Sequence, residues 1–149
     1  MPIPPLPADC VLDTNTVLAL WLFEDPTLTR LRAAVEGGCL RPIASPPTLE
    51  ELRRVLAYPQ FARAPAQQQA LLAAYQGRCH AVVPLPPEGV PGLPACRDAD
   101  DQKFLELAIV AGAPLLLSRD KALLRLARHR LVRDRLKVMR PEALEALLP

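Results

Sequence analysis

Four acidic residues stand where an apolar, strand-like run gives way to a helix-like one, and this placement points to metal-dependent chemistry. They are Asp13 in VLDTN, Glu51 in TLEEL, Asp101 in DADDQKFLEL and Asp120 in LLLSRDKALL. In an open parallel sheet the carboxyl ends of neighbouring strands converge, and ligands bind in the crevice just outside them. Carboxylates brought together there must bind protons or gather around a divalent cation. We therefore predict one carboxylate pocket built from four distant segments.

The elements that must position these acids alternate along the chain. Strands are predicted over residues 10–12, 39–44, 80–83, 115–117 and 136–139, and helices over residues 16–23, 27–36, 46–57, 66–76, 99–111, 121–129 and 141–148. Ser45 followed by Pro46 is typical of a helix start, and Gly37 with Gly38 is typical of a helix end. Strands that alternate with helices imply an α/β fold with a parallel sheet.

Helical phase separates the candidate ligands from their acidic neighbours. A helix turns by about 100° per residue, so the apolar stripe of its helix leaves Glu50 on the opposite side and Glu51 near the edge of the stripe. Asp101 lies in line with the apolar face of the helix that follows it, whereas Asp100 lies off that face. Glu51 and Asp101 are therefore the better candidates, because a carboxylate on an apolar face needs a partner.

Each acid also has a purely structural interpretation. Asp13 and Asp98 are of a residue type that caps helix starts, and Asp101 stands three residues after Asp98. Asp120 in a first helical turn would interact favourably with the helix dipole. These interpretations stay open for each residue taken singly, but four coincidental helix-start acids are less expected than one shared pocket.

Composition is that of a globular protein with one domain. The 149 residues fit one core, and the 50% hydrophobic and 23% charged fractions argue against disorder. No apolar stretch reaches the roughly 18 residues that span a bilayer, and the N-terminal segment lacks the pattern of a secretion signal. We therefore expect a cytoplasmic protein with a single domain over residues 1–149, flexible over residues 1–8.

Cysteine, histidine and charge patterns narrow the chemistry to oxygen ligands. The four cysteines form no C-x-x-C pair, so we expect buried free thiols rather than a zinc or redox site, and two histidines are too few for a histidine-rich metal site. The net charge of +2 is too mild to indicate nucleic-acid binding by itself. Residues 121–140, with eight basic residues and one acid, could follow a phosphate backbone or simply cover a helix end and an edge strand.

The ordered motifs resemble those of the PIN-domain family, especially its toxin-like bacterial ribonucleases. Asp13-Thr14-Asn15 is similar to the family's D-T-N after the first strand, and Glu51-Leu52 is similar to its E-L. RDADDQKFLELA, from Arg97 to Ala108, resembles R-D-x-x-D-x-K-F-L-E-L-A, and Ser118-Arg119-Asp120 resembles T/S-x-D. The match in order and spacing covers nearly the whole chain. It implies a three-layer α/β/α sandwich with a central, mainly parallel sheet of about five strands.

The same resemblance implies a divalent-metal-dependent endoribonuclease that cleaves single-stranded or loop RNA and acts as the toxin of a toxin–antitoxin pair. The catalytic residues, which would also hold Mg²⁺ or Mn²⁺, would be Asp13, Glu51, Asp101 and Asp120, with Asp98 as a nearby fifth carboxylate. The residues expected to orient them are Asn15 and Ser118, and those expected to bind RNA are Arg97, Arg119 and Lys121. A cognate antitoxin, a homodimer and products with 5′ phosphates are further expectations.

Three other functions stay in view. One is a PIN-like RNA-processing nuclease without a toxin role. Another is a catalytically inactive module that works through a partner, against which the presence of all four acids argues. In the third, Asp13 is a phospho-accepting nucleophile, as in haloacid-dehalogenase-like phosphatases. Those enzymes place a second Asp two residues after the first, where this chain has Asn15.

Overall fold

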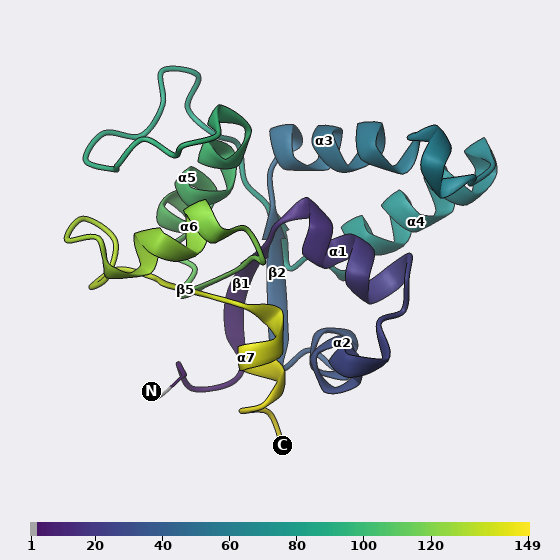
Figure 1. The fold of residues 1–149 in the computed structure, drawn as a ribbon, viewed down its shortest axis with the longest axis horizontal. Coiled ribbons are helices and arrows are strands. Elements are labelled where there is room, and N and C mark those ends of the chain that lie inside the picture. The colour runs from purple at the N-terminus through teal and green to yellow at the C-terminus, as the bar shows by residue number, and fades with distance from the viewer. Residues whose placement is uncertain (1–2) are drawn as a thin grey trace.

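The computed structural model describes residues 3–149, in which five strands form one sheet. The strands are β1 (Ala8–Leu12), β2 (Leu40–Ala44), β3 (Ala81–Val82), β4 (Leu115–Leu117) and β5 (Lys137–Met139). Their spatial order is β3-β2-β1-β4-β5, and every neighbouring pair is parallel. The prediction of a central, mainly parallel sheet of about five strands is therefore confirmed (Figure 1).

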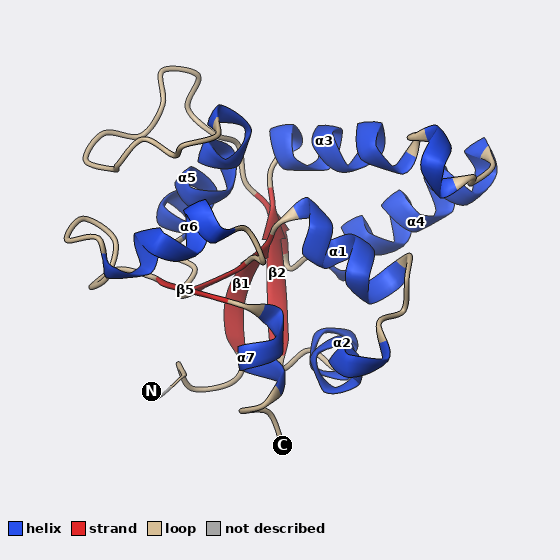
Figure 2. Ribbon diagram, viewed as in Figure 1, coloured by secondary structure: helices blue, strands red, loops and turns tan. Residues whose placement is uncertain are grey.

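Helices cover both faces of this sheet (Figure 2). In the described residues they are α1 (Thr14–Trp21), α2 (Thr29–Glu36), α3 (Pro46–Leu56), α4 (Pro65–Arg78), α5 (Gln102–Ala111), α6 (Lys121–Arg125) and α7 (Pro141–Glu145). Buried side chains of α1 to α4 and α7 form one apolar cluster with the sheet, and those of α5 and α6 form another. The three layers of the predicted sandwich are thus helices, sheet and helices.

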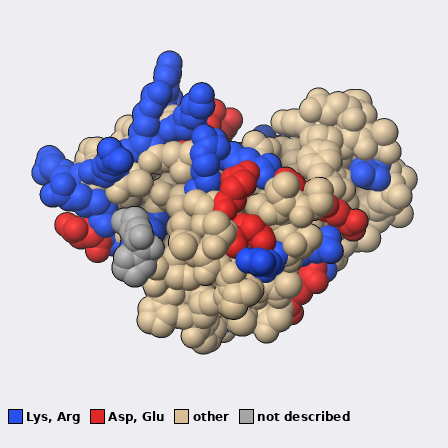
Figure 3. All heavy atoms as spheres, turned by 60° about the horizontal axis from the view of Figure 1, so that its bottom comes forward, with Lys and Arg blue, Asp and Glu red and all other residues tan. Residues whose placement is uncertain are grey.

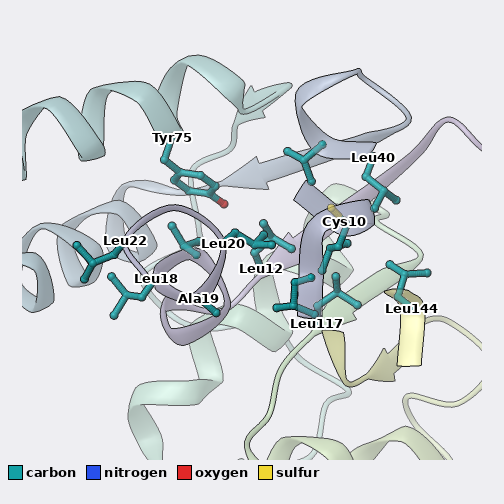
Figure 4. Close-up of a cluster of buried hydrophobic side chains, with 14 of the residues drawn as sticks. Cys10, Leu12, Leu18, Ala19, Leu20, Leu22, Leu40, Tyr75, Leu117 and Leu144 are labelled. Atoms are coloured by element: carbon teal, nitrogen blue, oxygen red, sulfur yellow. The ribbon is translucent and has the colours of Figure 1, made fainter. Parts of the chain in front are cut away.

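Side chains of the central strands alternate between the two clusters. In β4, Leu115 and Leu117 belong to the first cluster and Leu116 to the second, and all three are fully buried. Parallel strands that are covered on both faces read as continuous apolar runs, which explains the Leu-Leu-Leu sequence. Figure 4 shows how side chains of β1, β4, α1 and α4 gather in the first cluster.

Local sequence fixes the helices that carry two of the acids. Ser45 caps α3, because its Oγ accepts a hydrogen bond from the amide of Thr48 while its own amide donates to Thr48 Oγ1. α5 ends at Gly112, whose φ of 65° is a left-handed conformation that glycine adopts without strain. These signals set the register of Glu51 on α3 and place Asp101 just before α5.

Several helix boundaries differ from the sequence-based expectation; α7, for example, ends at Glu145 instead of residue 148. α4 continues through Gly77 to Arg78, because a glycine inside a helix costs only about 1 kcal/mol and the buried Tyr75 anchors this last turn. The helix predicted over residues 121–129 is divided into α6 and a 3₁₀ turn, Leu126–Arg128. A second 3₁₀ turn, Ala99–Asp101, precedes α5 and makes Asp101 its N-cap residue.

The flexibility expected over residues 1–8 stays a prediction, and in the structure residues 3–8 contact the rest of the fold. Ala8 begins β1 and is buried, and Ile3 and Leu6 pack against the first cluster. Residues 1–2 lie outside the described residues. The cysteines are free, as expected, but among them only Cys10 is buried and Cys39 is exposed. No helix within residues 3–149 combines the length and apolar character needed to cross a membrane.

Candidate functional site

The sheet brings two of the acid-bearing segments together at one edge. β1 and β4 are neighbours with Leu12 opposite Leu117, so Asp13 and Ser118 follow at the same carboxyl edge. Because β2 lies on the other side of β1, the strand order reverses between β1 and β4. Ligands of open α/β sheets bind at such a switch point.

Asp13 is buried, with 7% of the residue exposed, and both of its carboxylate oxygens accept hydrogen bonds. Oδ1 accepts from the amide nitrogen (2.9 Å) and Oγ1 (2.6 Å) of Thr16, and Oδ2 accepts from Ser118 Oγ (2.6 Å). Asp13 therefore caps α1 as well as lying in the pocket. Burial raises the pKa of Asp13 above its ordinary value of 3.8. The charge of Asp120 adds to this increase, and the hydrogen bonds oppose it.

Ser118 connects Asp13 to the segment that carries Asp120. The hydroxyl that donates to Asp13 also accepts a hydrogen bond from the amide nitrogen of Asp120 (2.9 Å). Asp120 is exposed, and its Oδ1 accepts from the amide of Leu123 (3.0 Å), which caps α6. One buried serine thus fixes the relative positions of two acids that lie 107 residues apart in the sequence.

Asp101 differs from Asp13, Glu51, Asp98 and Asp120 because one of its oxygens is buried without a partner, a condition that it shares with Glu142. Its Oδ2 is buried and makes no hydrogen bond within the described residues. The pKa of Asp101 is raised to about 6, mainly by desolvation and then by the negative charges of Asp120, Asp98, Asp13 and Glu51, in that order. The acids of four separate segments therefore act on this one carboxyl group.

Glu51 has a cationic partner that the sequence did not indicate. Its Oε1 lies 2.7 Å from Lys103 Nζ, and the two side chains are 17% and 16% exposed. Thr14 donates a hydrogen bond from its hydroxyl to Glu51 Oε2. Glu50 is exposed and pairs with Arg53 instead. The two neighbouring glutamates thus point to different sides of α3, in agreement with their helical phase.

Asn15 is placed differently from expectation, whereas Asp98 lies near Asp101 and caps a turn, the two interpretations that the sequence left open for it. Asn15 is exposed, and the hydroxyls that bind the acids belong to Thr14, Thr16 and Ser118. A D-T-N-T sequence at a helix start offers these hydroxyls, and this signal could have found them. Asp98 is exposed and caps the 3₁₀ turn before α5 by accepting from the amide of Asp100 (2.9 Å).

Arg119 lines the same open cleft as Asp98 and Asp120, but two carboxylates of the scaffold hold its guanidinium. Its guanidinium lies 3.0 Å from Asp25 Oδ2 and 2.5 Å from Glu142 Oε1, which ties the start of α6 to α7 and to the segment after α1. Hydrogen bonds from Thr27, and then from Arg119, lower the pKa of Asp25 to about 2. A guanidinium engaged by two carboxylates is poorly placed to bind phosphate, so the expected RNA-binding role does not fit Arg119.

Arg97 and Lys121 fit that role better. Both are exposed, and together with Asp98 and Asp120 they line an open cleft of about 710 Å³. Cations beside acids at the mouth of a cleft can attract a phosphodiester while the acids remain available for a metal ion.

The donor set fits a hard divalent cation, although it is not a ready-made cage. Within residues 3–149, no group of three or more His, Cys, Asp or Glu side chains is arranged to hold a metal ion. Lys103 neutralises Glu51, and one oxygen of Asp120 bonds to its own helix. All candidate ligands are carboxylates, however, and Asp101 Oδ2 is buried without a partner. Mg²⁺ commonly takes only one or two carboxylates together with waters and substrate phosphate.

Comparison with known proteins assigns the family. Residues 9–122, a range that includes all four acids, match the family described as PIN domain. No curated protein matches the chain. Among solved structures, the chain is similar to VapBC2 from Rickettsia felis, which was solved bound to a DNA fragment from their promoter. The TM-score is 0.58 at 16% identity over 87% of this chain and 96% of that one, a likeness of fold. Because the family match covers well over half of the sequence, this chain belongs to the PIN domain family.

Proposed function

We propose that this protein is an endoribonuclease that depends on Mg²⁺ or Mn²⁺ and cleaves single-stranded or loop RNA. The observation that carries the proposal is the buried, unpartnered Oδ2 of Asp101 among the other acids. Keeping such a carboxylate ionised is costly, and costs of this kind concentrate at functional sites where a ligand completes the arrangement. Family membership supports the proposal, because PIN domains are generally nucleases.

The ion would be held by Asp13, Glu51, Asp101 and Asp120, with Asp98 nearby. A bound Mg²⁺ or Mn²⁺ supplies Lewis-acid activation of a water for attack on phosphorus and stabilises the charge on the departing 3′ oxygen. Products with 5′ phosphates follow from this polarity of cleavage.

The chain's own residues would prepare the site before the ion arrives. Thr16 and Ser118 fix the plane of the Asp13 carboxylate, and because Oδ1 already accepts two bonds, its unused acceptor capacity lies mainly on Oδ2. Lys103 offsets one negative charge of the pocket by pairing with Glu51. A flexible RNA strand can bend its backbone into a crevice that a duplex cannot enter, which favours single-stranded or loop substrates.

The biological role proposed here is that of the toxin of a toxin–antitoxin pair, acting in the cytoplasm and neutralised by a protein partner. The likeness to the VapBC2 structure supports it. Induced expression should then arrest bacterial growth, Asp101→Asn should not, and the product of an adjacent short reading frame should relieve the arrest. Growth without arrest would favour the alternative of an RNA-processing nuclease.

A homodimer is proposed as well. Phe23, on the segment after α1, is 57% exposed, whereas Leu22 beside it is buried. The apolar surface expected from Trp21, Leu22 and Phe23 therefore narrows to Phe23, with Trp21 half-buried. Light scattering at low protein concentration would reveal a monomer and refute this proposal.

A second candidate function is a module that no longer cuts and works through its partner. The observation in its favour is that no three of the side chains that bind metals are grouped in the described residues. This candidate predicts no RNA hydrolysis at any Mg²⁺ or Mn²⁺ concentration.

Cleavage of an end-labelled, unstructured RNA decides between the two candidates. We expect cleavage with Mn²⁺ or Mg²⁺, none with EDTA, and loss of cleavage in Asp101→Asn. The matched control is Asp100→Asn, because Asp100 is exposed on the same turn. A wild-type protein that leaves the RNA intact, or an Asp101→Asn variant that cleaves like Asp100→Asn, would contradict the nuclease proposal.

A further inference from the structure

Basic side chains continue from the cleft beside Asp120 along α6. Lys121, Arg125 and Arg128 follow one another at positions i, i+4 and i+7, which places them on one side of α6 and of the 3₁₀ turn after it. All three are exposed. With Arg140, which precedes α7, they line a second open groove of about 550 Å³, called the α6 groove below.

The α6 groove and the open cleft beside Asp98 and Asp120 meet at Lys121, which lines both. No acidic residue lines the α6 groove, and none of its four cations forms a salt bridge within the described residues. Figure 3 shows Lys and Arg gathered on the side of the molecule that carries α6, next to Asp and Glu near its middle. Lys103 and Arg119, by contrast, are neutralised by carboxylates. The charge of the α6 groove is therefore available to an anion from outside.

We infer that the α6 groove binds the phosphate backbone of an RNA strand that extends from the acidic pocket, so that nucleotides on one side of the cleavage point are held along α6. The inference rests on the proposed function. Lys121 and Arg128 are about 11 Å apart along a helix axis, so the run of cations is long enough to contact more than one phosphate of a strand.

The remaining lining of the α6 groove indicates what kind of recognition it performs. Leu124 and Ala127 are its other lining residues, and it contains no aromatic side chain on which a base could stack and no amide side chain that could read a base edge. Contacts would go to phosphates, which fix position without reading sequence. Target choice by the protein would then arise elsewhere than in this groove.

An acidic peptide is the competing occupant of the α6 groove, because it would meet the same four cations. The continuity of the groove with the acids favours RNA, since a strand cleaved at the pocket must leave it along the surface. A peptide requires no such continuity. Binding measurements with RNA and with an acidic peptide separate the two occupants. Only the RNA affinity should depend on the number of phosphates that the groove contacts.

Binding of a fluorescent oligouridylate about twelve nucleotides long, in EDTA and over a range of KCl concentrations, tests the inference. The variant is Arg125→Gln with Arg128→Gln, and the matched control, with the same loss of charge, is Arg54→Gln with Arg63→Gln on exposed surface outside the groove. Losing two phosphate contacts should make the slope of log affinity against log salt less steep by about 1.4. Near 0.1 M salt this corresponds to an RNA affinity about 25-fold weaker than that of the wild type. The control should change affinity by less than about twofold.

Equal RNA affinity in the groove variant and the control would overturn the inference. So would an outcome in which polyglutamate loses affinity for the groove variant while the oligouridylate does not. Circular dichroism confirms that both variants are folded. Cleavage of the same RNA with Mn²⁺ is a separate measurement, because groove-dependent binding without cleavage would contradict only the nuclease proposal. Cleavage with binding that ignores Arg125 and Arg128 would contradict only the groove.

Discussion

Replacing Asp101 by asparagine removes the charge of this side chain and keeps its shape. The folded protein raises the pKa of Asp101 from 3.8 to about 6, mainly by desolvation and then by the surrounding carboxylates. Since a tenfold change in an equilibrium is worth about 1.4 kcal/mol, ionised Asp101 could destabilise the fold by up to about 3 kcal/mol. Solvent screens a partly exposed group, and the start of α5 favours an anion, so we discount this value to about 1–1.5 kcal/mol.

The sign of the pH dependence follows from the direction of the change. The folded chain holds the Asp101 proton to a higher pH than the unfolded chain does, so the stability associated with the protonated form is complete below about pH 4. It is lost as the pH rises through about 6. At pH 8 in EDTA, Asp101→Asn should therefore exceed the wild type in free energy of unfolding by about 1–1.5 kcal/mol, or roughly 3–5 °C in melting temperature. The difference should vanish near pH 4.

Urea and thermal unfolding in EDTA at several pH values measure this difference, with Asp100→Asn as the control. A pH-independent difference, or an Asp101→Asn protein no more stable than wild type at pH 8, would refute the reasoning. Repeating the series with Mn²⁺ tests the ligand role separately. A ligand at one hundred times its Kd stabilises the folded state by about 2.7 kcal/mol. The wild type should gain from Mn²⁺, and Asp101→Asn should gain less.

Three further predictions concern the partners of the acids. Glu51→Gln should lower RNA cleavage by about a hundredfold or more in a Mn²⁺-dependent assay. The control, Glu50→Gln at an exposed position, should keep cleavage within about twofold of wild type. Similar losses of cleavage in both variants would show that Glu51 has no special role. Lys103→Met should destabilise the protein in EDTA by about 1–2 kcal/mol, because Glu51 loses its cationic partner. The same variant should gain more in melting temperature when Mn²⁺ is added, because no other cation in the described residues pairs with Glu51. Arg119→Gln should lower the melting temperature by about 2 °C and leave oligouridylate affinity unchanged, and weakened RNA binding would restore its predicted role in the site.

Much of the fold was predictable because its signals are local. The β4 run of three leucines, the Ser45-Pro46 helix start and the helical phase of Glu51 each follow from a few adjacent residues. Convergence of Asp13 with the β4 segment was predictable only as a general property of parallel sheets. The order β3-β2-β1-β4-β5, which makes the two segments neighbours, depends on how entire helices pack.

Apart from the Thr16 hydroxyl, which bonds to Asp13 three residues away, the site features that sequence reasoning missed are long-range pairings of polar groups. Lys103 meets Glu51 across the contact between α5 and α3, at a separation of 52 residues. Arg119 reaches back 94 residues to Asp25, and its place beside Asp120 in the sequence suggested an open site instead. No periodicity encodes which charged side chain finds which partner, because that depends on packing distances of a few ångströms. Charged residues that are neighbours in the sequence therefore did not predict which charged side chains pair in the structure.

The capping hydrogen bonds stabilise some acids of the site and not others. Asp13 caps α1, Asp120 caps α6 and Asp98 caps a 3₁₀ turn, so each of these three carboxylates offsets part of its repulsion by a structural hydrogen bond. Glu51 is offset by Lys103. Asp101 has neither: it makes no capping bond, one oxygen is buried without a partner, and its ionisation is opposed by every other acid of the pocket. Structural hydrogen bonds or an ion pair thus stabilise the negative charge of four acids, whereas the charge of Asp101 only destabilises the fold. The proposed metal chemistry therefore depends most on Asp101.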